Sequence, residues 1–234
     1  MDRNLPKICS NDLDTSLCAA EALDGPRHPG ITLALSIAMI LMSTVVFAGV
    51  ENFDAVTPGT LPDDWTCGVT GKGSPVWKVE TDSSAPSKPN ILKQSGTGTF
   101  PWCVKKSAQI TDGFVEVKVK PLAGREDQAG GVLWRFKDGD NYYVARANAL
   151  ENNVSLYHTE KGRRITIKYV TASVSANQRH ALRVEFSGSA IKVRLDGTQY
   201  IELKDNHITG AGAVGVWTKA DSVTAFDDFS YGGQ

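Results

Sequence analysis

Hydrophobic and polar residues alternate along most of the chain from about residue 49 to its end. A period of two places successive side chains on opposite faces of a β-strand, and Val, Ile, Tyr, Phe and Trp are common in these segments. Turn formers with glycine at 137–141, 186–190 and 195–199 are typical of hairpins. We expect strands at residues 76–80, 114–120, 131–136, 141–148, 154–159, 164–170, 180–186, 190–196, 199–203, 213–218 and 225–231. With no apolar helical stripe after residue 48, this pattern predicts one all-β domain, a β-sandwich or barrel.

The first 48 residues have a different pattern. Residues 1–30 show neither helical nor strand periodicity. Residues 31–48, ITLALSIAMILMSTVVFA, carry no charge. We expect a hydrophobic leader helix that acts as a signal peptide, cleaved after Val46-Phe47-Ala48. An uncleaved membrane anchor and a buried helix of the main fold are the alternatives. The sequence therefore divides into a leader, 1–48, and one domain, 49–234, which is secreted or periplasmic, or held outside the membrane by 31–48.

Composition and cysteine content agree with an exported domain. The chain has 234 residues, a net charge of −1 and 22% charged residues. No overall field would recruit nucleic acid, and membrane contact would come only through 31–48 if that segment is uncleaved. Cys9 and Cys18 lie in the leader, which leaves Cys67 and Cys103 for an oxidising compartment. We expect a disulfide between these two residues, with two free buried thiols as the alternative.

Two adjacent acids occur in the last predicted strand, TAFDDFSYGG, residues 224–233. On a strand, Asp227 and Asp228 point to opposite faces and cannot act as an acid/base pair. If the first and last strands lie side by side, Asp54 comes close to them. Carboxylates and main-chain carbonyl oxygens are the ligands that Ca²⁺ prefers, so a structural calcium site is predicted here. The alternative is that one aspartate caps main-chain N–H groups while the other is solvated.

Polar residues that could bind a ligand gather on two neighbouring predicted strands. Alternation puts Arg135, Arg146 and Asn148 on one face of the sheet, with Glu151 nearby and Tyr142 on the same strand as Arg146. Such a cluster on a concave sheet could hold sugar hydroxyls or an acidic glycan. The alternative is a cross-strand arginine–carboxylate network on a solvated face. Trp134 and Trp217 are expected in the core.

The same region carries a resemblance to a known family. AGGVLWRFKDGDNYYVARANALENNVSLYHTEKGRR, residues 129–164, resembles the central hairpins of concanavalin A-like lectin/glucanase sandwiches. Residues 59–96 and FDDFSYG, residues 226–232, add to the likeness. More narrowly, it is similar to the bacterial exported branch of laminin G-like or 3-keto-disaccharide hydrolase-like domains. The resemblance implies an antiparallel jelly roll, a fold that hosts lectins, lyases, hydrolases and adhesion modules.

A catalytic site is not recognisable in the sequence. The glucanases of this fold use a Glu-x-Asp-x-x-Glu strand, and this chain has only Glu116 in the nearest equivalent. Glu126 and Asp127 are interpreted as part of a solvated turn. The histidines have no ligand-spaced neighbours in sequence and are expected to be structural or exposed: His158, His180 and His207.

The sequence therefore favours a non-catalytic carbohydrate-binding module, monomeric, without a certain cofactor. Two alternatives stay open: a glycoside hydrolase or lyase of the 3-keto-disaccharide hydrolase-like type, and a structural or adhesion domain of the cell envelope.

Overall fold

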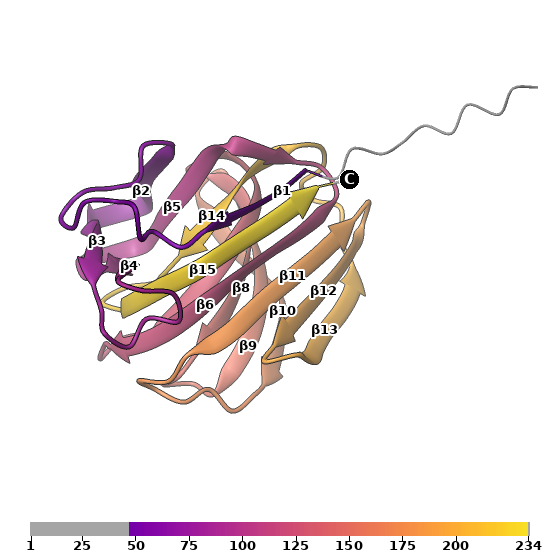
Figure 1. Cartoon of the computed structure of the whole chain (residues 1–234). Helices are drawn as coiled ribbons and strands as arrows, with labels where there is room; N and C mark the ends of the chain where they lie inside the picture. The colour runs from indigo at the N-terminus through magenta and orange to yellow at the C-terminus, as the bar shows by residue number, and fades with distance from the viewer. Residues whose placement is uncertain (1–46, 234) are drawn as a thin grey trace, which may run out of the picture. The chain divides into compact units, whose positions relative to one another are not determined.

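The computed structural model describes residues 47–233, which form fifteen β-strands in two antiparallel sheets (Figure 1). Sheet A has eight strands, which are β13 (Thr198–Lys204), β12 (Ala190–Leu195), β11 (His180–Ser187), β6 (Gly113–Ala123), β15 (Val223–Gly233), β4 (Asn90–Gln94), β3 (Trp77–Thr81) and β1 (Phe47–Glu51). Sheet B has seven strands, in the order β10 (Arg163–Thr171), β9 (Asn153–Glu160), β8 (Asn141–Asn148), β7 (Ala129–Asp138), β14 (Gly212–Trp217), β5 (Thr97–Ile110) and β2 (Trp65–Ser74). No helix occurs within residues 47–233, so the all-β prediction is confirmed for this part of the chain.

The main core lies between the two sheets because each strand turns alternate apolar side chains inward. In β11, Leu182, Val184 and Phe186 are buried while the intervening residues are half-buried. They pack with Val132 and Trp134 of β7 from the opposite sheet. The alternation read from the sequence thus corresponds to the two faces of each sheet.

The first and last described strands lie side by side, which is the condition on which the calcium prediction depended. β1 pairs with residues 229–233 of β15, and β4 pairs with residues 224–226 on the same side of it. The ladder between β15 and β6 is interrupted between Asp227 and Ser230, and Asp228 has a φ of 46°. This bulge lies where β15 passes from β4 to β1.

A loop of residues 82–89 is anchored to the outer face of sheet A. Ser87 donates two hydrogen bonds to the fully buried carboxylate of Asp227, at 3.0 and 3.2 Å. Arg179 donates to Asp82 at 3.1 Å. Ala85 and Ile91 pack on Ala225 of β15. Burial raises the pKa of Asp227 to about 6, against the hydrogen bonds from Asp228 and Ser87 that favour the charged form.

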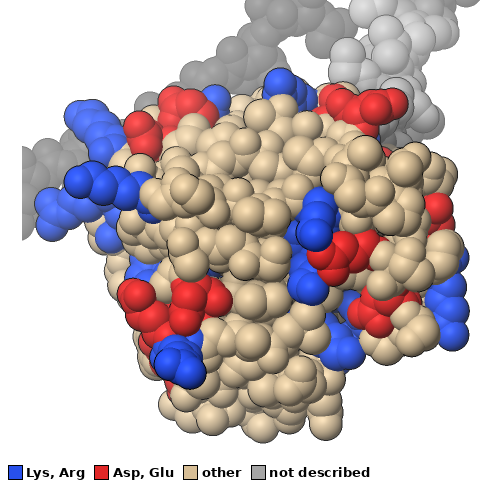
Figure 2. Space-filling model, turned by 90° about the vertical axis from the view of Figure 1, so that its left-hand side faces the viewer, with Lys and Arg blue, Asp and Glu red and all other residues tan. Residues whose placement is uncertain are grey.

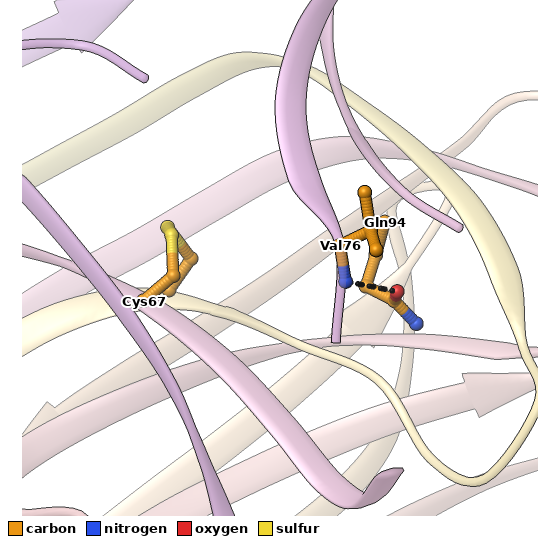
Figure 3. Close-up of a disulfide and its surroundings, with 4 residues drawn as sticks. Cys67, Val76 and Gln94 are labelled. Atoms are coloured by element: carbon orange, nitrogen blue, oxygen red, sulfur yellow. Dashed lines mark hydrogen bonds between the residues drawn. A yellow bond between two sulfur atoms is a disulfide. The ribbon is translucent and has the colours of Figure 1, made fainter. Parts of the chain in front are cut away.

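Cys67 of β2 and Cys103 of β5 form a disulfide between directly paired residues of adjacent strands (Figure 3). The bond joins residues that are 36 positions apart in the sequence. The predicted pairing is therefore confirmed. Near it, the main-chain N–H of Val76 donates to the buried side chain of Gln94 at 3.3 Å.

The predicted leader lies almost wholly outside the described residues, since 1–46 are not described. Phe47 and Ala48, at its predicted end, belong to β1. Among the residues that are described, no helix is long and apolar enough to cross a membrane.

Candidate functional site

A second apolar cluster covers the face of sheet B that points away from sheet A. It contains only residues of sheet B, and its buried members come from β7, β8, β9, β5 and β14: Leu133, Tyr142, Val144, Tyr157, Val104, Ala213 and Trp217. Phe100, Trp102 and Phe136 are partly buried against them. An outer sheet face with this much aromatic surface is unusual for a solvated face and indicates a covered or concave one.

Arg164 shows how strongly this face is curved. It extends from the edge strand β10, and its Cζ lies 4.3 Å from the ring centroid of Tyr157 on β9. The same Cζ is 4.6 Å from the ring centroid of Phe100 on β5, although four strands separate β10 from β5 in the sheet. The outer face of sheet B is therefore concave, and Arg164 bridges its two sides through cation–π contacts.

Arg146 of β8 is the centre of a polar cluster on the concave face. Its side chain is 2% exposed and donates to Asp127 at 3.0 Å and to Glu151 at 2.5 Å. A third hydrogen bond runs to Asn153 Oδ1 at 3.2 Å. Charge-assisted bonds to a planar guanidinium fix both carboxylates in place. The cluster is thus a rigid, preorganised set of polar groups at one end of the sheet.

Asp127 is fully buried beneath this cluster, which corrects the expectation that it lies in a solvated turn. Lys219 donates to it at 2.9 Å and Asn148 at 3.1 Å, in addition to Arg146. Burial raises the pKa of Asp127, and the charges of Arg146 and Lys219 oppose that rise. Its neighbour Glu126 is exposed, as predicted. The carboxylate of Asp127 anchors Arg146 and Lys219, and the solvent does not reach it.

Glu151 and Tyr169 form the exposed rim of the cluster. The Glu151 side chain is 41% exposed and Tyr169 is 50% exposed. The Tyr169 hydroxyl donates to Glu151 at 3.2 Å, and Asn153 donates to the same carboxylate at 2.8 Å. Burial alone would raise the pKa of Glu151, but the bonds from Asn153 and Arg146 lower it. Glu151 is therefore an ionised, solvent-accessible hydrogen-bond acceptor.

A depression of about 430 Å³ lies next to the polar cluster. Phe100 and Lys219 line it, together with Thr97 and Glu126. Since Lys219 also pairs with Asp127, the depression and the Arg146 cluster share a wall. A ligand in the depression would contact the ring of Phe100 and the ammonium group of Lys219.

The structure brings four of the five predicted ligand-binding residues onto the concave face. Arg146, Asn148 and Glu151 belong to the cluster described above. Tyr142 lies on the same face but is fully buried, with its hydroxyl bonded to Thr70 and Trp217. Tyr142 therefore supports the floor of the face. Trp134 is buried in the main core, whereas Trp217 is buried in the cluster on the concave face.

Arg135 does not join the others, which corrects the predicted arrangement. It has a φ of 47° at a bulge in β7, after which the alternation is shifted by one residue. Its guanidinium lies 5.6 Å from the ring centroid of Phe186 in the main core and donates to the carbonyls of Gly188 and Ile208. Regular alternation would place Phe136 on the same face as Trp134, but Phe136 contacts Trp102 on the concave side instead.

The aspartates predicted to bind calcium are engaged in separate contacts. Asp54 accepts a hydrogen bond from the main-chain N–H of Asn90 at 3.0 Å, and Asp227 accepts those from Ser87. The N–H of Asp228 donates to the side chain of Asp227 at 2.8 Å. Within residues 47–233, the set of three His, Cys, Asp or Glu side chains with ligand atoms within 4.8 Å is a different one. Calcium at this bulge stays a prediction, and it would need main-chain oxygens.

Comparison with solved structures places the fold. The carbohydrate-binding module CBM66 from Bacillus subtilis matches with a TM-score of 0.60 at 20% identity, over 71% of this chain and 94% of that one. The domain has the concanavalin A-like jelly-roll fold. The jelly roll of the Emp47p carbohydrate recognition domain matches with a TM-score of 0.54 at 11% identity, over 80% and 95% of the two chains. A Bacteroides ovatus GH16 protein matches with a TM-score of 0.53 at 8% identity, over 80% and 99%. No protein-family model and no curated protein matches the sequence.

Several residues near Arg146 on the concave face of sheet B were not predicted from the sequence. Asn153, Tyr157 and Tyr169 face the concave side from β9 and β10, at positions that alternation alone assigns. The signal was present, because β9 pairs with β8 residue by residue and continues the same face. Asp127 lies in the loop before β7, and Lys219 lies in the loop after β14. Sequence periodicity does not predict that these two loops meet.

Proposed function

We propose that the domain binds a carbohydrate on the concave face of sheet B, at the cluster around Arg146. The observation that carries this proposal is a rigid, buried arginine–carboxylate floor beneath an exposed rim of Glu151 and Tyr169. Sugars are recognised by aromatic surfaces combined with a few fixed polar groups that meet their hydroxyls. Tyr169 and Phe100 supply the aromatic surface, and Glu151 supplies an ionised acceptor.

Binding is favoured over hydrolysis by the state of the two carboxylates. Glycoside hydrolysis needs an acid and a second carboxylate that both reach the glycosidic bond. The environments of Asp127 and Glu151 do push their pKa values in opposite directions, as such a pair requires. Asp127, however, is fully buried and bound to Arg146, Lys219 and Asn148, so it cannot donate a proton to a substrate.

The ligand that fits the rim is a glycan rich in hydroxyls. Arg146 is already neutralised by Asp127 and Glu151, and it offers little charge to an acidic sugar. Charges on the outside of the molecule are mixed as well. Figure 2 shows acidic and basic side chains next to one another on the side where β2, β3 and β4 lie in Figure 1, with uncharged surface between them.

We further propose that the domain works outside the cytoplasm as a monomer, in the exported branch of laminin G-like domains. The disulfide between Cys67 and Cys103 supports an oxidising compartment. Residues 31–48, whether cleaved or retained, supply the means of export.

A glycan array probed with the full chain tests the binding proposal. We expect binding to a limited set of glycans, weakened about tenfold or more by Tyr169→Ala, the loss of one stacking contact. Lys192→Ala is the matched control, since Lys192 is a half-exposed residue of sheet A, and it should bind like the wild type. Empty arrays, or equal binding by Tyr169→Ala, would remove the proposed site.

A further inference from the structure

Three side chains with metal-binding atoms meet at the edge where the two sheets approach each other. His158 lies in β9 of sheet B, and Asp205 and His207 lie in the segment after β13 of sheet A. One ligand atom from each lies within 4.8 Å of the others. His207 Nδ1 is 2.9 Å from Asp205 Oδ2, and the two imidazole rings stack with centroids 4.1 Å apart. Sequence spacing gave no hint of this set, because 47 positions or more separate His158 from the other two.

His158 is buried without a hydrogen bond to either ring nitrogen. The residue is 2% exposed, and neither Nδ1 nor Nε2 has a hydrogen-bond partner among residues 47–233. A buried polar group without a partner costs about 1–3 kcal/mol, so such groups in folded proteins usually have one. His180 provides the contrast. It is also buried, yet its Nδ1 contacts Asp196 at 2.7 Å and its Nε2 contacts Ser175.

The carboxylate of the set is held in place from behind. The Tyr143 hydroxyl donates to Asp205 Oδ1, and the main-chain N–H of Ile208 donates to the same hydroxyl at 3.2 Å. Metal-binding carboxylates are oriented by outer hydrogen bonds of this kind. His207, in contrast, is exposed and can turn its ring at little cost. The arrangement therefore combines two metal ligands in fixed positions, His158 and Asp205, with a third, His207, whose ring can reorient.

We propose that His158, Asp205 and His207 bind a divalent transition-metal ion of the Zn²⁺ class, with solvent completing the coordination. Two imidazole nitrogens and one carboxylate oxygen are ligands that Zn²⁺ accepts in tetrahedral geometry, at about 2.0–2.2 Å. Ca²⁺ prefers six or more oxygen ligands and is a poor match for two imidazoles. Binding needs a small rotation of His207, because the two rings are now stacked. The ion would then satisfy the buried nitrogen of His158.

Burial lowers the pKa of His158, and the nearby charge of His207 acts in the same direction. Imidazole ligates metals in its neutral form, through a ring nitrogen that carries no proton. The consequence of binding would be mechanical. The ion would strengthen the connection between sheet B and the segment after β13, which Tyr143 of β8 already makes through Asp205 and Ile208.

Thermal unfolding of the full chain, stripped of metal by a chelator, tests this proposal. We expect one equivalent of Zn²⁺ to raise the unfolding midpoint of the wild type by several degrees, since a ligand that binds only the folded state stabilises it. His207→Ala should leave the stripped protein almost unchanged and abolish the rise. Asn206→Ala is the matched control, an exposed neighbour that should retain the full shift.

Co²⁺ gives a second measurement that does not depend on stability. Its visible absorption reports nitrogen and oxygen ligands at low coordination number, and it should develop in the wild type and in Asn206→Ala but not in His207→Ala. The proposal is overturned if Zn²⁺ gives no shift, or if His207→Ala keeps both the shift and the absorption. A shift with Ca²⁺ that His207→Ala abolishes would also overturn it.

Discussion

The two outer faces of the sandwich each carry an arginine between two carboxylates, and the two arginines lie in different environments. Arg146 on sheet B is 2% exposed and contacts Asp127 and Glu151. Arg183 on sheet A is 29% exposed and contacts Glu116 at 3.0 Å and Glu185 at 2.9 Å. Each arginine connects neighbouring strands or loops through similar ion pairs with two carboxylates. The two clusters therefore contain the same chemical groups and differ in how deeply the arginine is buried.

Curvature accounts for the difference. Sheet B bends until Arg164 on one side meets Phe100 on the other, and the groups between them lose contact with water. Arg183 instead lies over the ring of Phe114 on an open face, with its guanidinium 4.0 Å from the ring centroid. The comparison teaches that a sequence pattern of arginine and acids is compatible with either a solvated network or a binding floor. The shape of the sheet decides between them.

Removal of Arg146 should have the largest effect. Arg146→Ala leaves Asp127 buried with Lys219 as its remaining cation, and breaking a buried ion pair costs about 3–5 kcal/mol. Chemical denaturation at pH 7 measures the loss in the free energy of unfolding. A cost below 1 kcal/mol would mean that water reaches this floor, and the distinction between the two faces would fail.

Asp227 provides a test on sheet A itself, because it is the carboxylate that the 82–89 loop buries. Its pKa in the folded protein, about 6, lies above the value of 3.8 expected when unfolded. The folded state therefore binds the proton more tightly, and this contribution to stability is present below pH 3.8 and is lost as the pH rises through 6. Asp227→Asn should stabilise the protein by about 1–3 kcal/mol at pH 7.5 and by almost nothing at pH 4.

Unfolding of both proteins across this pH range measures the effect. If the free energies of unfolding of the wild type and of Asp227→Asn change in parallel with pH, the pKa of Asp227 is the ordinary one. Burial under the 82–89 loop would then not control its ionisation.

The smallest effect is expected at Arg183. Exposed ion pairs contribute about 0.2–1 kcal/mol, so Arg183→Ala should cost no more than this. Raising the ionic strength to about 1 M should reduce that difference further through screening, whereas the cost of Arg146→Ala should persist. Denaturation in low and high salt provides the measurement. If the loss of unfolding free energy in Arg183→Ala does not depend on salt, the ion pairs of Arg183 behave like the buried ones of Arg146, and the comparison between the two faces fails.

Much of the fold could be predicted, since it depends on alternation that local sequence carries. All eleven expected strands occur, and four further strands escaped prediction: β1, β2, β4 and β5. Glycine at 68, 71 and 73 interrupts β2, and Pro101 interrupts β5. Residues of this kind weaken a strand on their own. Pairing with neighbours, together with the disulfide between β2 and β5, holds these strands in the sheet.

The candidate site could be predicted only as far as regular pairing extends. Tyr142, Arg146 and Asn148 share a face because β8 pairs with β9 without a register shift. The prediction was wrong for Arg135 because one residue in a left-handed conformation exchanges the faces, and nothing in the local sequence marks that residue. Asp127 and the histidine set require knowledge of which loops meet, which only the assembled sandwich provides.

The position of β15 has a consequence for how the chain comes to be folded. This strand lies inside sheet A, between β6 on one side and both β4 and β1 on the other. Until residues 223–233 have left the ribosome, β6 lacks that neighbour and β1 has no strand to pair with in the domain. Sheet A therefore closes only after synthesis of these residues, through contacts between distant parts of the chain that form slowly.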